Sequence, residues 1–287
     1  MEIHAKQRLI RWDDRPLLMG IVNVTPDSFS DGGRFLDPHA AVAHAWRLVE
    51  EGADLLDIGA ESTRPGSIPV GEAEELHRLI PVVAAVAKAV SVPISVDTSK
   101  AAVARAALDA GAVIVNDVTA LRGDTAMVDV VTQTGAGVVL MHMQGTPQTM
   151  QDAPEYGDVL EEVGAFLTER ARFAMEHGIA KNQIVLDPGL GFGKVLMHNL
   201  DLLARLKAFT KFGFPVLVGP SRKAFIGQLV EQPVQDREWG TAGAVALAVE
   251  QGANILRVHD VAAMRDVIRV AAAIARRITS PLREQHA

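Results

Sequence analysis

The sequence predicts an α/β protein built as a (β/α)8 barrel, also called a TIM barrel. Three observations lead to this prediction. Short aliphatic runs recur along the chain with helical patterns between them, at intervals of about 34 residues. The runs are apolar throughout rather than alternating, which is typical of strands buried on both faces of a parallel sheet. The chain has 287 residues, and an α/β barrel of about 250 residues is normally a single domain.

Eight strands are expected, and the regularity of the eight units favours a closed barrel over an open doubly wound sheet, which is the alternative. Residues 1–16 precede the first strand and are predicted to form a short hairpin over the barrel floor. The barrel is expected to span residues 17–279, followed by a tail at 280–287. The predicted strands are Leu17–Asn23, Leu55–Gly59, Ile94–Asp97, Val113–Asp117, Gly137–Met141, Ile184–Asp187, Val216–Gly219 and Ile255–Val258.

Helix boundaries can be predicted from residues that favour helix ends. One predicted helix has Pro38 at its start and Gly52 just beyond its end, a matched pair of boundary residues. A second has acidic residues in its first turn and Lys88 near its end, as the helix dipole prefers. The predicted helices are Pro38–Glu51, Glu72–Val90, Ala101–Ala110, Asp158–His177 and Val261–Ile278.

Composition excludes several classes of protein. An apolar fraction of 48% excludes a disordered chain, and a formal net charge of −7 argues against a nucleic acid as the main partner. The absence of cysteine excludes disulfides, zinc–thiolate sites and cysteine nucleophiles. No apolar stretch approaches the ~18 residues that span a bilayer, and the charged segment Met1–Trp12 does not resemble a signal peptide. We therefore expect a cytoplasmic protein without a membrane partner.

Polar residues follow almost every predicted strand. In an α/β barrel the active site lies at the carboxyl ends of the strands, so these residues are expected to meet on one rim. Buried polar groups without partners cost about 1–3 kcal/mol each, so this many on one rim indicate a ligand site. The strand-end residues are Asn23, Glu61–Arg64, Asp97–Lys100, Asn116–Asp117, Met141–Met143, Asp187–Gly189, Ser221–Lys223 and Arg257–Asp260.

The predicted rim has two chemical parts. Asp97, Asn116 and Asp187 supply acceptors, which suit a planar heterocycle rich in N–H donors. The other part is cationic or able to become so, and it suits a phosphate or carboxylate; it comprises Arg64, Lys223, Arg257 and His259. The two parts together predict a substrate with a polar ring and an anionic group.

Two long loops follow the first and second strands, at Asn23–Gly33 and Ser62–Gly66. They contain Gly and Pro, which favours mobile lids, although ordinary surface loops are the alternative. The glycine-rich segment Gly189–Lys194 matches neither a phosphate-binding P-loop nor a dinucleotide fingerprint in its spacing.

No cluster of carboxylates or histidines supplies a complete metal site in this sequence. A Mg²⁺ ion would therefore be held largely by water and by substrate phosphates, with Asn23 as a protein ligand. His142 and His259 end strands and are the two histidine candidates for the site, whereas most of the others fall in helical patterns.

At these strand ends the sequence resembles the dihydropteroate synthases, a family of pterin-binding enzymes. Two long segments carry most of the resemblance, MGIVNVTPDSFSDGG at 19–33 and DIGAESTRPG at 57–66. Shorter matches follow in order, and together they extend the resemblance over residues 17–278. They are Asp97–Lys100, Asn116–Asp117, Met141–Met143, Asp187–Gly189, Gly191–Lys194, Ser221–Lys223 and Arg257–Asp260.

The resemblance implies a transferase of folate biosynthesis, inhibited by sulfonamides, that joins a dihydropterin diphosphate to 4-aminobenzoate. It implies Mg²⁺ as cofactor and a homodimer formed through the later helices. It assigns the pterin to Asp97, Asn116, Asp187 and Lys223, with Met141 as a further substrate contact. It assigns the diphosphate and Mg²⁺ to Asn23, Arg257 and His259. It assigns the aminobenzoate pocket to Phe29, Thr63, Arg64, Pro65, Phe192 and Ser221. Asp31 and Arg64 are expected to order over the reacting centre, and Asp97, Lys223, Asp31 and Arg64 to be catalytic.

Three other functions remain as alternatives. A pterin-binding methyltransferase would share the acceptor residues but should lack the first-loop segment and Ser221–Lys223, which are present. A barrel that binds pterins without catalysis is disfavoured because Asn23, Asp31, Arg64 and Lys223 are all in place. An unrelated barrel lyase or aldolase is the third.

Overall fold

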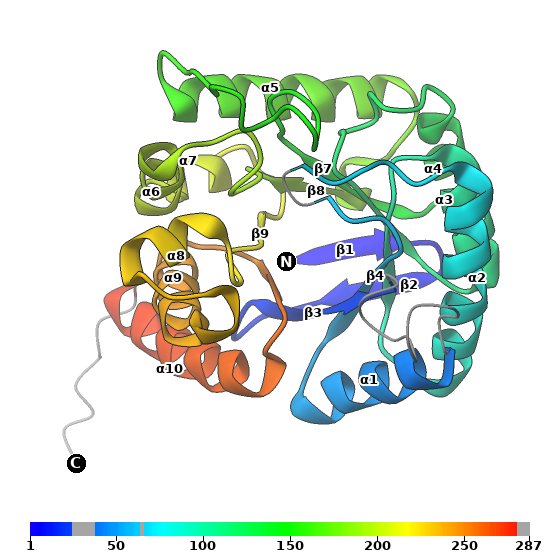
Figure 1. The fold of residues 1–287 in the computed structure, drawn as a ribbon, viewed down its shortest axis with the longest axis horizontal. Coiled ribbons are helices and arrows are strands. Elements are labelled where there is room, and N and C mark those ends of the chain that lie inside the picture. The colour runs from blue at the N-terminus through cyan, green and yellow to red at the C-terminus, as the bar shows by residue number, and fades with distance from the viewer. Residues whose placement is uncertain (25–37, 64–65, 280–287) are drawn as a thin grey trace.

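The structure is a computed structural model that describes residues 1–24, 38–63 and 66–279. In this part of the chain, parallel strands form a barrel, helices surround it, and a small hairpin lies across one end (Figure 1). The predicted (β/α)8 barrel is confirmed.

Neighbouring strands follow the chain order almost all the way round the barrel. The first barrel strand pairs in parallel with the last, with Leu17 opposite Ile255. The remaining junction is a single parallel bridge between Leu186 and Val216. In an open doubly wound sheet the first and last strands do not pair, so that alternative is excluded. The strands are β3 (Leu17–Asn23), β4 (Leu55–Gly59), β5 (Ile94–Asp97), β6 (Ile114–Asp117), β7 (Gly137–Met141), β8 (Ile184–Asp187), β9 (Leu217–Val218) and β10 (Ile255–Val258).

The predicted strand boundaries differ from the structure at two places. β6 begins at Ile114 rather than Val113, and β9 is shorter than the predicted Val216–Gly219. Val216 lies outside β9, and its backbone N–H donates to the side chain of Asn254 at 2.8 Å. Sequence patterns do not reveal this side-chain contact.

Helices cover the outside of the barrel (Figure 1). The predicted helix at Asp158–His177 begins one residue later, because the Asp158 carboxylate caps it by accepting hydrogen bonds from the N–H groups of Leu160 and Glu161. The predicted ends at Val90, His177 and Ile278 shift to Ala89, Glu176 and Thr279. The helices are α1 (Pro38–Glu51), α2 (Glu72–Ala89), α3 (Ala101–Ala110), α4 (Met127–Thr134), α5 (Val159–Glu176), α6 (Leu196–Ala204), α7 (Lys207–Thr210), α8 (Ala224–Val230), α9 (Glu238–Glu250) and α10 (Val261–Thr279).

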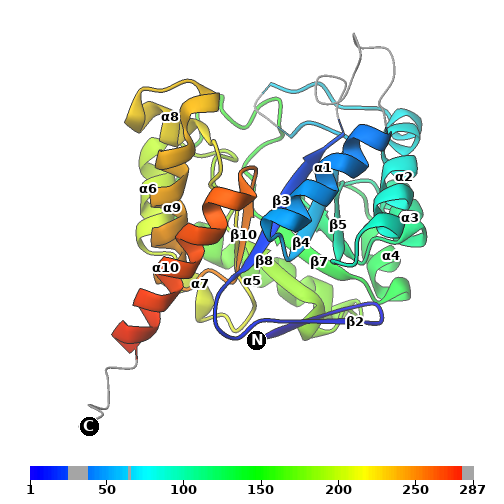
Figure 2. The ribbon, with the colours of Figure 1, turned by 90° about the horizontal axis from the view of Figure 1, so that it is seen from below.

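The N-terminal hairpin closes the barrel at the end opposite the carboxyl ends of the strands (Figure 2). It consists of β1 (Glu2–Ala5) and β2 (Arg8–Arg11), which pair in antiparallel fashion. Ile3, Ile10 and Trp12 are buried in one apolar cluster with residues from the barrel interior. The predicted hairpin floor is confirmed, while the division at residue 16 stays a prediction because the two parts share this core.

Within residues 1–24, 38–63 and 66–279, no helix is both long enough and apolar enough to cross a bilayer. The predicted tail at 280–287 lies outside these residues, as does most of the first long loop.

Candidate active site

The barrel interior has an apolar lower layer and a polar upper layer. Because side chains alternate along a strand, residues two apart point to the same face. The lower layer packs against the hairpin and includes Leu55, Ile114, Val139, Val185 and Ile255. Two positions further along the same strands, the upper layer contains Asp57, Asn116, Met141, Asp187 and Arg257. The fold therefore brings predicted ligand-binding residues from four of these strands, together with Asp57 from β4, to one end of the barrel.

Two buried carboxyl groups dominate this upper layer. Asp97 and Asp187 end β5 and β8, and each is only 7% exposed. Burial raises the pKa of Asp97 to about 7 and that of Asp187 to about 6. The nearby Arg257 opposes the rise at Asp97, and a 2.7 Å hydrogen bond from the Gly189 N–H opposes it at Asp187. Both groups are thus ready to accept or give up a proton near neutral pH.

Arg257 lies between two acidic residues, Asp57 on β4 and Asp97 on the neighbouring strand β5. Its Nε donates to Asp57 Oδ2 at 2.6 Å, and its Nη2 donates to Asp97 Oδ2 at 3.1 Å. The same Asp57 oxygen accepts a 3.0 Å hydrogen bond from Asn116 Nδ2. The sequence-based prediction assigned no role to Asp57, although a charged residue inside the apolar run of β4 was a visible signal.

The loop after β8 supplies an aromatic face for Lys223. The Lys223 ammonium lies 4.0 Å from the ring centre of Phe192, within the range of a cation–π interaction. The loop can approach this closely because Gly189 and Gly191 adopt positive φ angles of 68° and 78°. At Gly189 a Cβ atom would lie only 1.9 Å from the carbonyl oxygen of His142.

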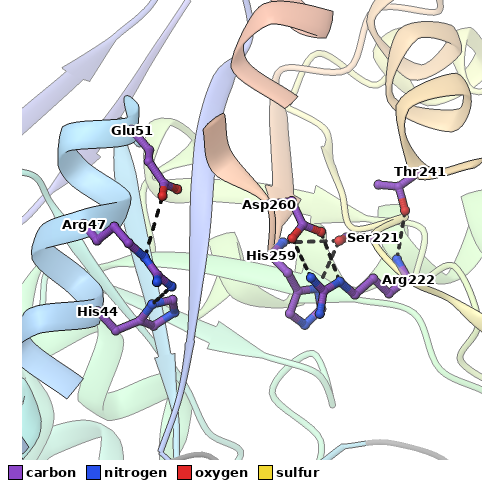
Figure 3. Close-up of polar contacts among 8 residues, drawn as sticks. All are labelled: His44, Arg47, Glu51, Ser221, Arg222, Thr241, His259 and Asp260. Atoms are coloured by element: carbon purple, nitrogen blue, oxygen red, sulfur yellow. Dashed lines mark hydrogen bonds and ion pairs between the residues drawn. The ribbon is translucent and has the colours of Figure 1, made fainter. Parts of the chain in front are cut away.

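Ser221 and His259 face each other across the ends of β9 and β10 (Figure 3). Ser221 Oγ lies 3.0 Å from His259 Nδ1, and it accepts a 3.2 Å hydrogen bond from the His259 N–H. Between Ser221 and Lys223, Arg222 has a positive φ of 59°, which is unfavourable for a residue with a side chain. Its contacts with Asp260 and Thr241 hold this turn in place (Figure 3).

The other histidine candidate, His142, is in contact with Lys194. It is buried beside the ring of Phe166, and its Nδ1 lies 2.9 Å from Lys194 Nζ. Burial lowers the pKa of His142 to about 2, so this ring stays neutral. We therefore interpret His142 as part of the support behind the site.

Three more predicted site residues lie in the described part of the chain: Asn23, Thr63 and Met141. Asn23 ends β3 opposite Gly59, and Asn23 and Thr63 are half-buried. Met141 is buried in a small cluster that also contacts Phe192. Within the described ranges, no three His, Cys, Asp or Glu side chains group as a metal site. Phe29, Asp31, Arg64 and Pro65 lie outside the described residues, so their predicted places stay predictions.

The arrangement defines an enzyme-type site in which buried acceptors and cations share one rim of a barrel. Its acids can accept hydrogen bonds from a ring and stabilise positive charge, while its cations can bind an anionic leaving group.

Comparison with known proteins points in the same direction. A model of the pterin binding enzyme family matches residues 19–259. The dihydropteroate synthase of Escherichia coli K12 is 49% identical over 255 residues, covering 89% of this chain and 90% of the relative. A structure of the Xanthomonas albilineans dihydropteroate synthase with 4-aminobenzoic acid superposes with a TM-score of 0.89 at 49% identity, covering 95% of this chain and 97% of that one. A structure of the Yersinia pestis dihydropteroate synthase in complex with a sulfonamide drug superposes with a TM-score of 0.90 at 45% identity, covering 96% and 99%.

The chain belongs to the pterin-binding enzymes and, within them, to the dihydropteroate synthase family. The family resemblance predicted from the strand-end residues is confirmed.

Proposed function

We propose that this chain transfers the (7,8-dihydropterin-6-yl)methyl group from its diphosphate ester to 4-aminobenzoate. The products are 7,8-dihydropteroate and diphosphate. One observation carries the proposal most directly: Asp97, Asn116 and Asp187 are each less than a tenth exposed and lie at or next to the carboxyl ends of β5, β6 and β8, on the same rim. Family membership supports the same reaction.

The pterin is proposed to bind to the acceptor groups of the upper layer. A pterin ring presents several N–H groups along its edge, and carboxylate or amide oxygens pair with such donors. Asp97, Asn116 and Asp187 supply these oxygens, Met141 packs against the ring, and Lys223 contacts it from the loop side. The raised pKa of Asp97 and of Asp187 fits this role. Burial removes water from each carboxylate, and the N–H groups of a bound ring would replace some of the lost hydrogen bonds.

The diphosphate is proposed to bind beside Asn23, Arg257 and His259. Mg²⁺ is expected to arrive with it, because an amide oxygen such as that of Asn23 suits this hard cation, which keeps several water and phosphate ligands. When bound, the ion would neutralise charge on the leaving diphosphate. Arg257 and His259 supply further positive charge or N–H donors at this position.

The 4-aminobenzoate is proposed to enter from the loop side of the rim. Thr63, Phe192 and Ser221 would line its pocket together with Phe29 and Pro65, and Asp31 and Arg64 would close over it. Sulfonamide drugs resemble this substrate, so we expect them to compete for the same pocket.

The proposed reaction begins when the bond between the pterin methylene carbon and the diphosphate oxygen breaks. Diphosphate leaves with the electron pair, and the remaining positive charge is delocalised into the pterin ring, stabilised above all by Asp97. The free amine of 4-aminobenzoate then forms the new C–N bond and loses one proton. An aryl amine needs no strong base for this attack, and holding the two substrates in line lowers the barrier by several kcal/mol.

We also propose a cytoplasmic homodimer. Its support is the set of apolar side chains that α9 and α10 expose, since Leu247, Val270 and Ile274 are each more than half exposed. Packing of these faces against a second copy would remove them from water.

A turnover assay tests the proposed function. The purified chain receives the pterin diphosphate and 4-aminobenzoate, and both diphosphate and 7,8-dihydropteroate are quantified, with Mg²⁺ or with a chelator. We expect the two products in equal amounts, a rate at least tenfold lower with the chelator, and recovery on adding Mg²⁺. Methyl transfer from a methyltetrahydrofolate, or pterin binding without turnover, would instead favour one of the alternatives.

A further inference from the structure

We propose that Asp57 is a positioning residue that fixes the side-chain amide of Asn116 with its carbonyl oxygen available to the pterin ring. This inference rests on the proposed function and extends it to a residue that does not itself need to touch substrate.

The first step is the identity of the groups that meet at Asp57. Asp57 is fully buried in the middle of β4, two positions beyond the apolar Leu55. One of its oxygens, Oδ2, accepts hydrogen bonds from both Asn116 Nδ2, at 3.0 Å, and Arg257 Nε, at 2.6 Å. The guanidinium of Arg257 can only donate, so this oxygen acts as an acceptor toward both groups.

The second step concerns the orientation of the Asn116 amide. The amide carries an NH2 donor group on one side and a carbonyl acceptor on the other, and a flip exchanges them. Because Asp57 requires a donor, the NH2 group of Asn116 has to face it. The carbonyl oxygen, Oδ1, is then the group left for another partner.

The third step is the state of that oxygen. Asn116 Oδ1 is buried, and no hydrogen-bond partner for it is present among the described residues. A buried oxygen without a partner has lost its hydrogen bonds to water, so it favours a ligand that brings an N–H donor to this place. A ring with N–H groups on its edge is such a ligand, whereas an analogue with an acceptor there would face repulsion.

Arg257 strengthens the arrangement. Its Nε shares the Asp57 oxygen with Asn116, and the guanidinium cannot become an acceptor. An oxygen must therefore occupy this position even in an Asp57→Asn variant, which has to place its own carbonyl oxygen toward Arg257. That variant keeps the acceptor for Asn116, whereas Asp57→Ala removes it.

The test measures the ring affinity separately from the diphosphate. The probe is 6-hydroxymethyl-7,8-dihydropterin, which contains the ring but no diphosphate, titrated by calorimetry into the full chain. We expect the dissociation constant to rise at least tenfold in Asp57→Ala and to stay within about threefold of the original protein in Asp57→Asn. The KM for 4-aminobenzoate should change less than twofold in Asp57→Asn, so that the effect is specific for the ring.

Ser95→Ala is the matched control. Ser95 lies opposite Asp57 on β5, is fully buried, and has a hydroxyl group for which no partner is present among the described residues. Its loss should leave the probe affinity unchanged, which separates a specific role of Asp57 from a general sensitivity of this layer.

A double-mutant cycle shows whether Asp57 acts through Asn116. In an Asn116→Ala background, Asp57→Ala should weaken probe binding by less than threefold, because the amide that it orients is gone. Additive losses would overturn the proposal, as would unchanged probe binding by a folded Asp57→Ala protein. If that protein does not fold, probe binding by Asp57→Asn as weak as by Asn116→Ala would overturn it.

A failure of the proposed function can be distinguished from a failure of the role proposed for Asp57. If the original protein neither binds the probe nor forms 7,8-dihydropteroate, the reaction assignment is wrong. If it does both and the Asp57 variants do not behave as described, only the role of Asp57 is wrong.

Discussion

Lys194 and His142 are in contact in the protein interior, with Lys194 Nζ 2.9 Å from His142 Nδ1. Lys194 also donates to the backbone oxygen of Phe192 at 2.9 Å, and it is only 3% exposed. The contact joins the end of β7 to the loop that carries Phe192. Burial lowers the pKa of Lys194 to about 7, since an ammonium group is poorly solvated there.

The first prediction concerns the pH dependence of stability at Lys194. Its pKa is lower in the folded protein than in the unfolded chain, so the unfolded chain holds more protons between pH 7 and about pH 10.5. The free energy of unfolding should therefore rise with pH in this window through Lys194. Lys194→Met should remove that rise. In urea titrations the increase in the free energy of unfolding between pH 7 and 9.5 should then be smaller by up to a few kcal/mol.

The exposed Lys207 on α7 provides the control for this experiment, and Lys207→Met should keep the original slope. If the free energy of unfolding depends on pH in the same way in Lys194→Met and in the original protein, the lowered pKa of Lys194 is contradicted.

The second prediction concerns catalysis by Lys223. Lys223→Ala removes the ammonium group that packs on the Phe192 ring and that we propose to lie near both substrates. We expect kcat/KM to fall at least a hundredfold, which corresponds to about 2.7 kcal/mol of transition-state stabilisation, with the melting temperature nearly unchanged. Lys207→Ala is the matched control in the diphosphate-release assay. A kcat/KM near the original value would remove Lys223 from the site.

The third prediction concerns the acid limb of the activity. In the proposed reaction Asp97 would stabilise positive charge only when ionised, and burial raises its pKa to about 7. The kcat/KM value should therefore rise with pH through about 7 and then level off. Asp97→Asn should lose at least a hundredfold in kcat/KM, together with this acid limb. Asp109→Asn, at an exposed position of α3, should behave like the original protein.

Ionisation of Asp97 should raise activity but lower the free energy of unfolding as the pH rises. Because the folded protein holds the Asp97 proton up to about pH 7 and the unfolded chain releases it near 3.8, folding loses stability through this group as pH rises between these values. The melting temperature of Asp97→Asn, measured relative to that of the original protein at the same pH, should therefore be higher at pH 8 than at pH 4. A variant with the same pH profile as the original protein would contradict the raised pKa.

The fourth prediction concerns association through α10. Ile274 is 56% exposed, and Ile274→Glu would place a charge in the proposed dimer interface. Sedimentation at micromolar concentration should show a dimer for the original protein and at least a tenfold weaker association for the variant. Met175→Glu on α5 changes an exposed apolar side chain elsewhere and should remain dimeric. A monomeric original protein would refute the homodimer.

The strand-end chemistry could be predicted from sequence because barrel geometry is regular. Once the strands are placed, alternation and parallel order bring Asp97, Asn116 and Asp187 to one rim without further information. The direction of Arg257 could not be predicted in this way. The resemblance assigns it to the diphosphate, whereas in the structure it also bonds to Asp57 and Asp97, from strands that lie far away in sequence.

The sequence by itself determined the repeating α/β pattern, the polar strand ends and the family, because these depend on local periodicity and on residue identity at fixed spacings. Only the tertiary structure decided which polar groups are paired. His142 and His259 each directly follow a strand, yet one contacts Lys194 and the other faces Ser221. The reason is that burial, charge pairing and hydrogen-bond direction depend on neighbours contributed by distant strands, which the order of residues does not specify.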